Sequence, residues 1–195
     1  NGGTISILTN TGAISATGAN GIVNRGSGTI ETITNSGTIT AGTNYGIANH
    51  GAITTITNTG TISASGNKIG IYNKLGTIDT LNNSQGESGS ALTYYGKLPT
   101  YYNVIVNSTS DFGKVVFSSV SGTTTFNVQT STLAADTTYS SVLSGLSSSD
   151  IASGTSDTFV SGSKRYDWTL SNSSGTLWDL VVAADQDITP DTNTS

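Results

Sequence analysis

Three basic side chains recur at a nearly constant spacing and are the strongest candidates for recognising a ligand. Arg25, His50 and Lys74 stand 25 and 24 residues apart, and each directly follows an asparagine. If the chain repeats with that period, the three form one basic row on an edge of the molecule, suited to an anionic glycan or lipopolysaccharide. Three cations about 5 Å apart at a wet turn interact weakly, so an ordinary solvated edge is the alternative interpretation.

Residues suited to catalysis are sparse. Some β-helical enzymes cleave acidic polysaccharides with clustered carboxylates, but the repeats hold only Glu31, Asp79 and Glu87, in different arms or distant coils. The single histidine lacks partners for a triad, and the sequence has no nucleophile elbow, phosphate loop or calcium nonapeptide. With no cysteine and one histidine, thiolate and multi-histidine metal sites are excluded. We therefore expect a non-enzymatic protein without cofactor or metal.

The amino-acid composition indicates which secondary-structure elements position these side chains. Of 195 residues, 34 are Thr, 29 are Ser and 24 are Gly, whereas Met is absent and strong helix formers are scarce. The chain should therefore be all-β. A net charge of −5 disfavours a nucleic-acid partner. No run of 18 apolar residues predicts a membrane span, and the start within a repeat suggests a piece of a longer chain.

An internal repeat of about 24 residues organises the first half. Its first arm carries isoleucine, its second arm reads glycine, small residue, isoleucine, and its third arm ends in asparagine. The first-arm isoleucines are Ile5, Ile30, Ile53 and Ile78, and the asparagines that end this arm are Asn10, Asn35, Asn58 and Asn83. No single unit can bury its apolar side, but stacked units can. The repeat predicts a right-handed parallel β-helix with three-strand coils over residues 1–98. At its corners we expect asparagine to take left-handed backbone and to hydrogen-bond its copy in the next coil, and glycine to supply positive φ.

Beyond residue 98 the pattern changes to aromatic-rich β-strands separated by polar turns, with strand candidates at residues 103–106, 114–117, 124–128, 139–143, 167–170 and 177–182. Ten of the 14 aromatic residues lie between Tyr101 and Trp178. We expect residues 99–183 to form a β-region that caps the coils, and residues 184–195 to form a polar linker. The predicted core of this cap, which we interpret as a folding nucleus, comprises Tyr102, Phe117, Phe126, Tyr139, Leu143, Trp168, Trp178 and Leu180.

The order of repeats, aromatic cap and polar linker resembles the membrane-proximal passenger region of bacterial monomeric autotransporters. The coil motifs Asn35-Ser36-Gly37-Thr38-Ile39 and Gly70-Ile71-Tyr72-Asn73 are similar to passenger coils. The segments 98–106, 139–146 and 177–181 resemble the junction region called the autochaperone. The resemblance implies a C-terminal β-barrel translocator as partner, a place on the bacterial cell surface or secretion from it, and a cap that templates folding of the coils during export.

The sequence thus favours a non-enzymatic stem whose cap nucleates folding and which displays a distal functional region. An adhesin or self-association module that binds glycans or other host or bacterial surface ligands is the main alternative. Tyr45 and Tyr72 are candidate sugar platforms under that alternative, with packing between coils as the competing explanation. A third interpretation is a carbohydrate-active enzyme whose catalytic residues lie in coils outside this sequence.

Overall fold

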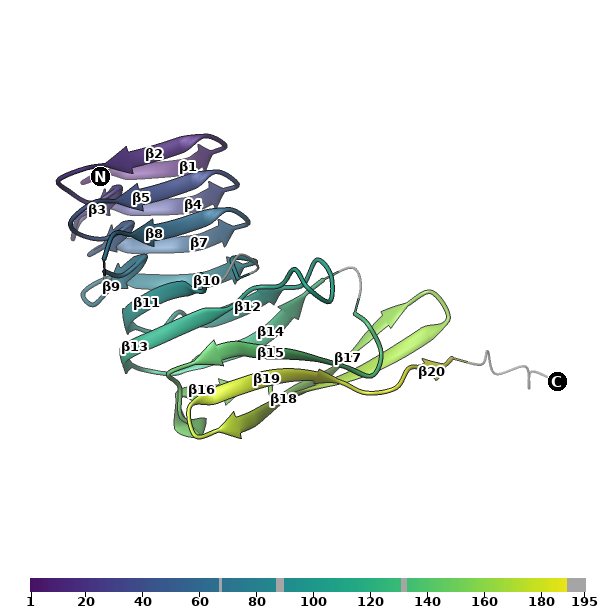
Figure 1. Ribbon diagram of the computed structural model, residues 1–195. Coiled ribbons are helices and arrows are strands. Elements are labelled where there is room, and N and C mark those ends of the chain that lie inside the picture. Colours follow the sequence, from purple (N-terminus) through teal and green to yellow (C-terminus); the bar gives the residue numbers. More distant parts are fainter. Residues whose placement is uncertain (67, 87–89, 131–132, 189–195) are drawn as a thin grey trace.

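The computed structural model describes residues 1–66, 68–86, 90–130 and 133–188. It is a parallel β-solenoid of about six turns with a spacing of about 24 residues. The coils stack from the first turn at one end of the molecule to a set of antiparallel strands at the other (Figure 1). The all-β parallel β-helix predicted from the repeat is confirmed.

Three sheets run along the stack. Sheet A contains, in spatial order, β1 (Thr4–Asn10), β4 (Thr29–Asn35), β7 (Ala52–Asn58), β10 (Thr77–Asn83), β12 (Tyr101–Ile105), β14 (Thr124–Gln129) and β16 (Ile151–Ser153). Sheet B contains β2 (Ala13–Ala16), β5 (Thr38–Ala41) and β8 (Thr61–Ala64). Sheet C contains β17 (Ser156–Ser161), β18 (Lys164–Ser174), β19 (Leu177–Val182), β15 (Thr137–Ser144), β13 (Val115–Ser121), β11 (Leu92–Lys97), β9 (Ile71–Asn73), β6 (Ile47–Asn49) and β3 (Ile22–Asn24), with β20 (Gln186–Asp187) paired to β18.

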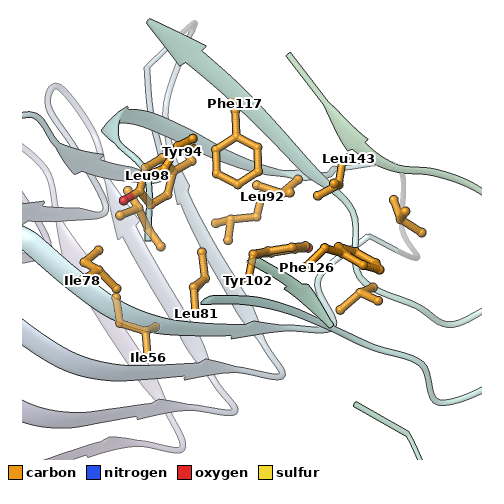
Figure 2. Packing of buried hydrophobic residues seen from close by; sticks show 14 of the residues in the cluster. Ile56, Ile78, Leu81, Leu92, Tyr94, Leu98, Tyr102, Phe117, Phe126 and Leu143 are labelled. Atoms are coloured by element: carbon orange, nitrogen blue, oxygen red, sulfur yellow. The ribbon is translucent and has the colours of Figure 1, made fainter. Parts of the chain in front are cut away.

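Two rows of inward-facing side chains run along the solenoid axis, and both change from aliphatic to aromatic, the row on sheet C in the fourth coil and the row on sheet A in the fifth. The row on sheet A is Leu8, Ile33, Ile56, Leu81, Tyr102 and Phe126. The row on sheet C is Ile22, Ile47, Ile71, Tyr94 and Phe117. Each residue pairs in register with its neighbour in the next coil, so the apolar core is continuous from the coils into the aromatic region (Figure 2).

The glycines of the repeat are required by close approach between coils. An added Cβ at Gly37 would collide with the carbonyl oxygen of Gly12 in the coil before it, and Gly37 itself does not have positive φ. The corner asparagines also differ from expectation, because none is among the positive-φ residues of the described chain. The left-handed corners predicted for Asn, and positive φ as the reason for Gly at this repeat position, were therefore wrong. Tight stacking of backbone on backbone is the physical reason.

The parallel stack continues beyond residue 98, where the sequence repeat ends. β12 pairs in parallel with β10, β14 with β12, and β13 with β11. The backbone pairing persists because it does not depend on side-chain identity, whereas the Ile and Asn pattern that reveals the repeat has been replaced. The parallel coils thus reach into the range 99–183, in which a cap was expected.

β15 joins the solenoid to the antiparallel end of the molecule. On one side it pairs in parallel with β13, and on the other it pairs antiparallel with β19. β18 then pairs antiparallel with β19 and β17. Because antiparallel pairing ends the coil progression, these strands close the stack at the bottom of sheet C (Figure 1).

Candidate functional site

The eight side chains predicted as the core of the cap are all buried. They come from β12, β13, β14, β15, β18 and β19, so six strands contribute to one cluster. Tyr102, Phe126, Leu143 and Leu180 have no exposed surface, and the most exposed of the eight, Trp178, is 6% exposed. The structure thus brings these residues into the same hydrophobic core as the isoleucines of the coils.

Ring contacts link the coils to the last strands. The Phe117 ring meets Tyr94 and Tyr102 edge-on, at centroid distances of 5.2 and 5.8 Å. Tyr102 lies 6.2 Å from Phe126, whose ring meets Trp168 edge-on at 5.7 Å. Edge-to-face pairs add stabilisation beyond area burial. The chain of contacts runs from the fourth coil to β18 without interruption.

Trp178 and its neighbours fasten the junction strand. Leu143 of β15 is opposite Val115 on the parallel side and opposite Trp178 on the antiparallel side. The indole Nε1 of Trp178 donates a buried hydrogen bond to the Leu146 carbonyl, 2.8 Å away. Tyr139 is opposite Leu180 and packs edge-on against Phe112. These contacts hold β15 to both the coils and the closing strands.

Two ladders of buried asparagines connect the coils, and sequence reasoning predicted their mutual hydrogen bonds. Along each ladder the Nδ2 of one asparagine donates to the Oδ1 of the next at 2.8–3.0 Å. The first ladder is Asn10, Asn35, Asn58 and Asn83, and the second is Asn24, Asn49 and Asn73. Such satisfied side-chain networks fix the register of a stack.

A buried tyrosine ends the second ladder. Asn73 Nδ2 donates to the Tyr94 hydroxyl at 2.8 Å, and that hydroxyl donates to the Lys97 carbonyl at 2.6 Å. Burial raises the pKa of Tyr94, so the phenol stays protonated and available as a donor. Tyr102 is equally buried, but its hydroxyl, which lies beside the Asn83 side chain, makes no hydrogen bond of normal geometry among the described residues. These two tyrosines therefore differ in a way that mutation can measure.

Gln85 closes an edge left open in the fourth coil. Within the described residues, sheet B ends at β8, so no strand of the fourth coil pairs with that edge. The Gln85 Oε1 accepts from the Ile62 N–H at 2.8 Å, and Gln85 Nε2 donates to the Ile62 carbonyl at 3.3 Å. Oε1 also accepts from Asn58 Nδ2 at 3.0 Å. Sequence reasoning missed Gln85, because the residue has no counterpart in the other repeats.

The structure places the three predicted basic residues at equivalent positions of successive coils. Arg25, His50 and Lys74 each follow a rung of the second asparagine ladder, and Arg25 and Lys74 are exposed. Since Asn73 is paired with Gly96, the next residue, Lys97, continues the row. Lys97 lies 23 residues after Lys74, close to the repeat period, and this spacing could have identified it. It was missed because the Gly-Ile-x-Asn motif that precedes the other members is absent there. We call Arg25, His50, Lys74 and Lys97 the basic row.

A column of tyrosines runs beside this row. Tyr45 and Tyr72 stack with ring centroids 4.3 Å apart, and Tyr72 and Tyr95 stack at 5.3 Å. Because each ring covers the face of the next, the faces between them are closed to a sugar, while the half-exposed rings still present edges to solvent. Packing between coils therefore accounts for the stacked faces of Tyr45 and Tyr72.

The carboxylates of the repeats stay apart. Glu31 and Asp79 are exposed on β4 and β10, which are separated by β7 in sheet A. Glu87 lies outside the described residues. Within the part of the chain that the structure describes, no group of three or more His, Cys, Asp or Glu side chains is arranged to hold a metal ion.

The fold defines a class of protein: a parallel β-solenoid closed by antiparallel strands around an aromatic core. Comparisons with models of protein families, with curated proteins and with solved structures find no match. No helix in the described ranges has the length and apolarity needed to cross a membrane.

Proposed function

We propose that this chain is the non-enzymatic stem of an autotransporter passenger, and that its C-terminal strands nucleate folding of the coils during export. In this role the partner is the chain's own outer-membrane β-barrel translocator, and the site of action is the bacterial cell surface. The stem then displays a functional region carried by more distal coils.

The observation that carries the proposal is the double pairing of β15. This strand belongs to the antiparallel end through β19 and to the parallel stack through β13. Once the antiparallel strands have folded, β15 presents an unpaired edge with which β13 can pair. Each coil that is added then presents an unpaired strand edge to the next coil.

The energetics of solenoids support this order of events. An isolated coil loses backbone conformational entropy before its apolar side is covered. Formation of the first coil is therefore unfavourable in free energy, whereas each later coil stacks on a folded neighbour and costs less. Antiparallel strands joined by short turns have local contacts and pay less loop-closure entropy. The largest side chains of the core gather at that end, where they lower the cost of the first coil.

An export assay tests the proposed role. The chain is joined to an outer-membrane β-barrel and an export signal, with an epitope at the N-terminal side of residue 1, and surface display is measured by labelling intact cells. We expect Trp178→Ala to reduce display strongly, whereas Tyr101→Ala, a large side chain 42% exposed on β12, leaves display unchanged. Equal display of the Trp178 variant, at equal total expression, would overturn the proposal.

Fragments separate folding from export. If residues 99–195 fold alone and resist guanidinium more strongly than residues 1–98, the C-terminal part can act as a template. Independent and equally stable folding of residues 1–98 would remove the need for one.

A further inference from the structure

One edge of the solenoid combines a regular line of basic side chains with an aromatic column. The basic row holds three of the chain's seven Lys and Arg side chains, Arg25, Lys74 and Lys97, together with its single histidine, His50. In-register stacking places successive members about 4.8 Å apart along the axis. This is one potential contact per coil, in a straight line.

The column of Tyr45, Tyr72 and Tyr95 runs in the same direction and touches the row. The His50 ring lies 5.9 Å from the Tyr72 ring, tilted by 51°. Each tyrosine is half-exposed, so its solvent-facing edge is available for contact. Row and column together form a strip of basic side chains and phenols that follows the solenoid axis.

The strip begins in an open hollow. A depression of about 400 Å³ is lined by Asn20, Val23, Arg25, Gly26 and His50. Asn20 Oδ1 accepts a hydrogen bond from the backbone N–H of Tyr45, which ties the hollow to the first ring of the column. Two members of the basic row thus face a concave surface large enough for a sugar unit.

We propose that this strip binds a linear acidic polysaccharide along the solenoid axis, with one sugar unit per coil. The coil spacing is close to the length of one sugar in an extended chain, so carboxylate or sulfate groups can meet the cations Arg25, Lys74 and Lys97 along the strip. The tyrosine hydroxyls can exchange hydrogen bonds with the O–H and carboxylate groups of such a chain. The inference concerns a ligand of the coils and does not depend on the export role of the cap.

Charge favours a glycan over the other polyanions. The chain carries a net charge of −5, which repels a densely charged nucleic acid. A glycan with one charge per one or two sugars is repelled less by the whole chain and can be attracted by the positive charges of the strip. A lipid surface requires apolar anchors, and Leu75 is the one large hydrophobic residue beside the row that is exposed in the described chain. A single exposed leucine is usual on protein surfaces.

The test uses the full chain and oligosaccharides of defined length. The probes are eight-sugar oligogalacturonate and eight-sugar heparin, which distinguish carboxylate from sulfate recognition, with carboxyl-reduced oligogalacturonate as the neutral match. Binding is followed by titration calorimetry at low and high salt. We expect binding of at least one acidic octamer, weakening with salt, with shorter oligomers weaker and the neutral match inactive.

Variants locate the binding. Lys74→Ala and Lys97→Ala each remove one exposed cation and should weaken binding about two- to five-fold, and the double variant about ten-fold. Lys68→Ala is the control, since Lys68 is equally exposed but lies in the loop between β8 and β9, away from the row. Circular dichroism verifies that each variant is folded. Absence of binding to both acidic octamers, equal binding of the neutral match, or an equal loss in the Lys68 variant would overturn the proposal.

Discussion

The side-chain amide of Gln85 pairs with both the N–H and the carbonyl of Ile62, as two successive peptide groups of a neighbouring parallel strand would. The two distances are 2.8 and 3.3 Å, and Gln85 is 8% exposed. One side chain thereby substitutes for a strand at the level where sheet B ends. This allows the chain to leave the three-strand coil for the two-sheet coils below it without exposing a buried backbone group.

We predict that Gln85→Ala destabilises the protein by about 3 kcal/mol, because the buried N–H of Ile62 loses its acceptor. Guanidinium unfolding followed by circular dichroism measures the change. A loss below about 0.5 kcal/mol would show that water replaces the amide and that the substitution for a strand is not needed.

Gln85→Glu adds a pH dependence. The introduced carboxyl is buried, so its pKa in the folded state rises above the unfolded value of about 4.3. Only its protonated form can donate to the Ile62 carbonyl, as Nε2 does now. The stability of this variant relative to the parent should therefore be highest below about pH 4 and fall as pH rises through the raised pKa. A pH-independent difference would contradict the geometry.

The two buried tyrosines give a matched pair. Tyr94→Phe removes a hydroxyl that accepts from Asn73 and donates to the Lys97 carbonyl, and we expect a loss of about 1–2 kcal/mol. Tyr102→Phe removes a hydroxyl that makes no hydrogen bond of normal geometry among the described residues, so we expect no loss or a gain of up to about 1 kcal/mol. The same unfolding measurement compares them. Equal losses would mean that the hydrogen bonds of Tyr94 do not stabilise the end of the ladder.

Glycine stacking is tested at equivalent positions of two coils. Gly37→Ala places a methyl group against the Gly12 carbonyl, and we expect a loss of about 3 kcal/mol or misfolding. Gly12→Ala is the control, because nothing lies within 4 Å of its added Cβ, and it should be neutral. Thermal melting of both variants is sufficient, and similar Tm values would refute tight backbone stacking as the reason for this glycine.

Trp178→Ala should cost about 3–5 kcal/mol, the usual range for a buried tryptophan, because it opens a cavity and removes the bond to the Leu146 carbonyl. Trp178→Phe retains much of the packing and should cost less. A loss below about 1 kcal/mol for the alanine variant would contradict the role of Trp178 in the core.

The sequence was most informative where side chains repeat. The pairing of Ile30 with Ile53 and the bond between Asn35 and Asn58 followed directly from the period, because stacked coils bring equal positions together. Strands near 124–128 and 177–182 were expected and are present as β14 and β19, whereas β16 and β17 were not expected.

What the sequence did not reveal depends on backbone geometry or on residues that occur once. The corner asparagines were assigned a left-handed backbone that they do not have, since their buried hydrogen bonds suffice to explain them. The coils were expected to end at residue 98, because the isoleucine pattern ends there. The inward-facing row in fact continues in register from Leu81 to Tyr102 and Phe126, whose aromatic side chains do not match the pattern. The roles of Gln85 and Lys97 depend on contacts with the preceding coil, and no local sequence pattern indicates those contacts.

Amide hydrogen exchange of the full chain tests most directly whether the aromatic end of the molecule stabilises the coils. We predict that amides of β15 and β19 are the best protected, and that Trp178→Ala lowers protection both there and in β4, β7 and β10. Ile33→Ala, in the second coil, should lower protection in the coils but leave β15 and β19 unchanged. Slower exchange of the coil amides than of the amides in β15 and β19, or loss of protection in the closing strands in Ile33→Ala, would show that the aromatic end does not stabilise the coils.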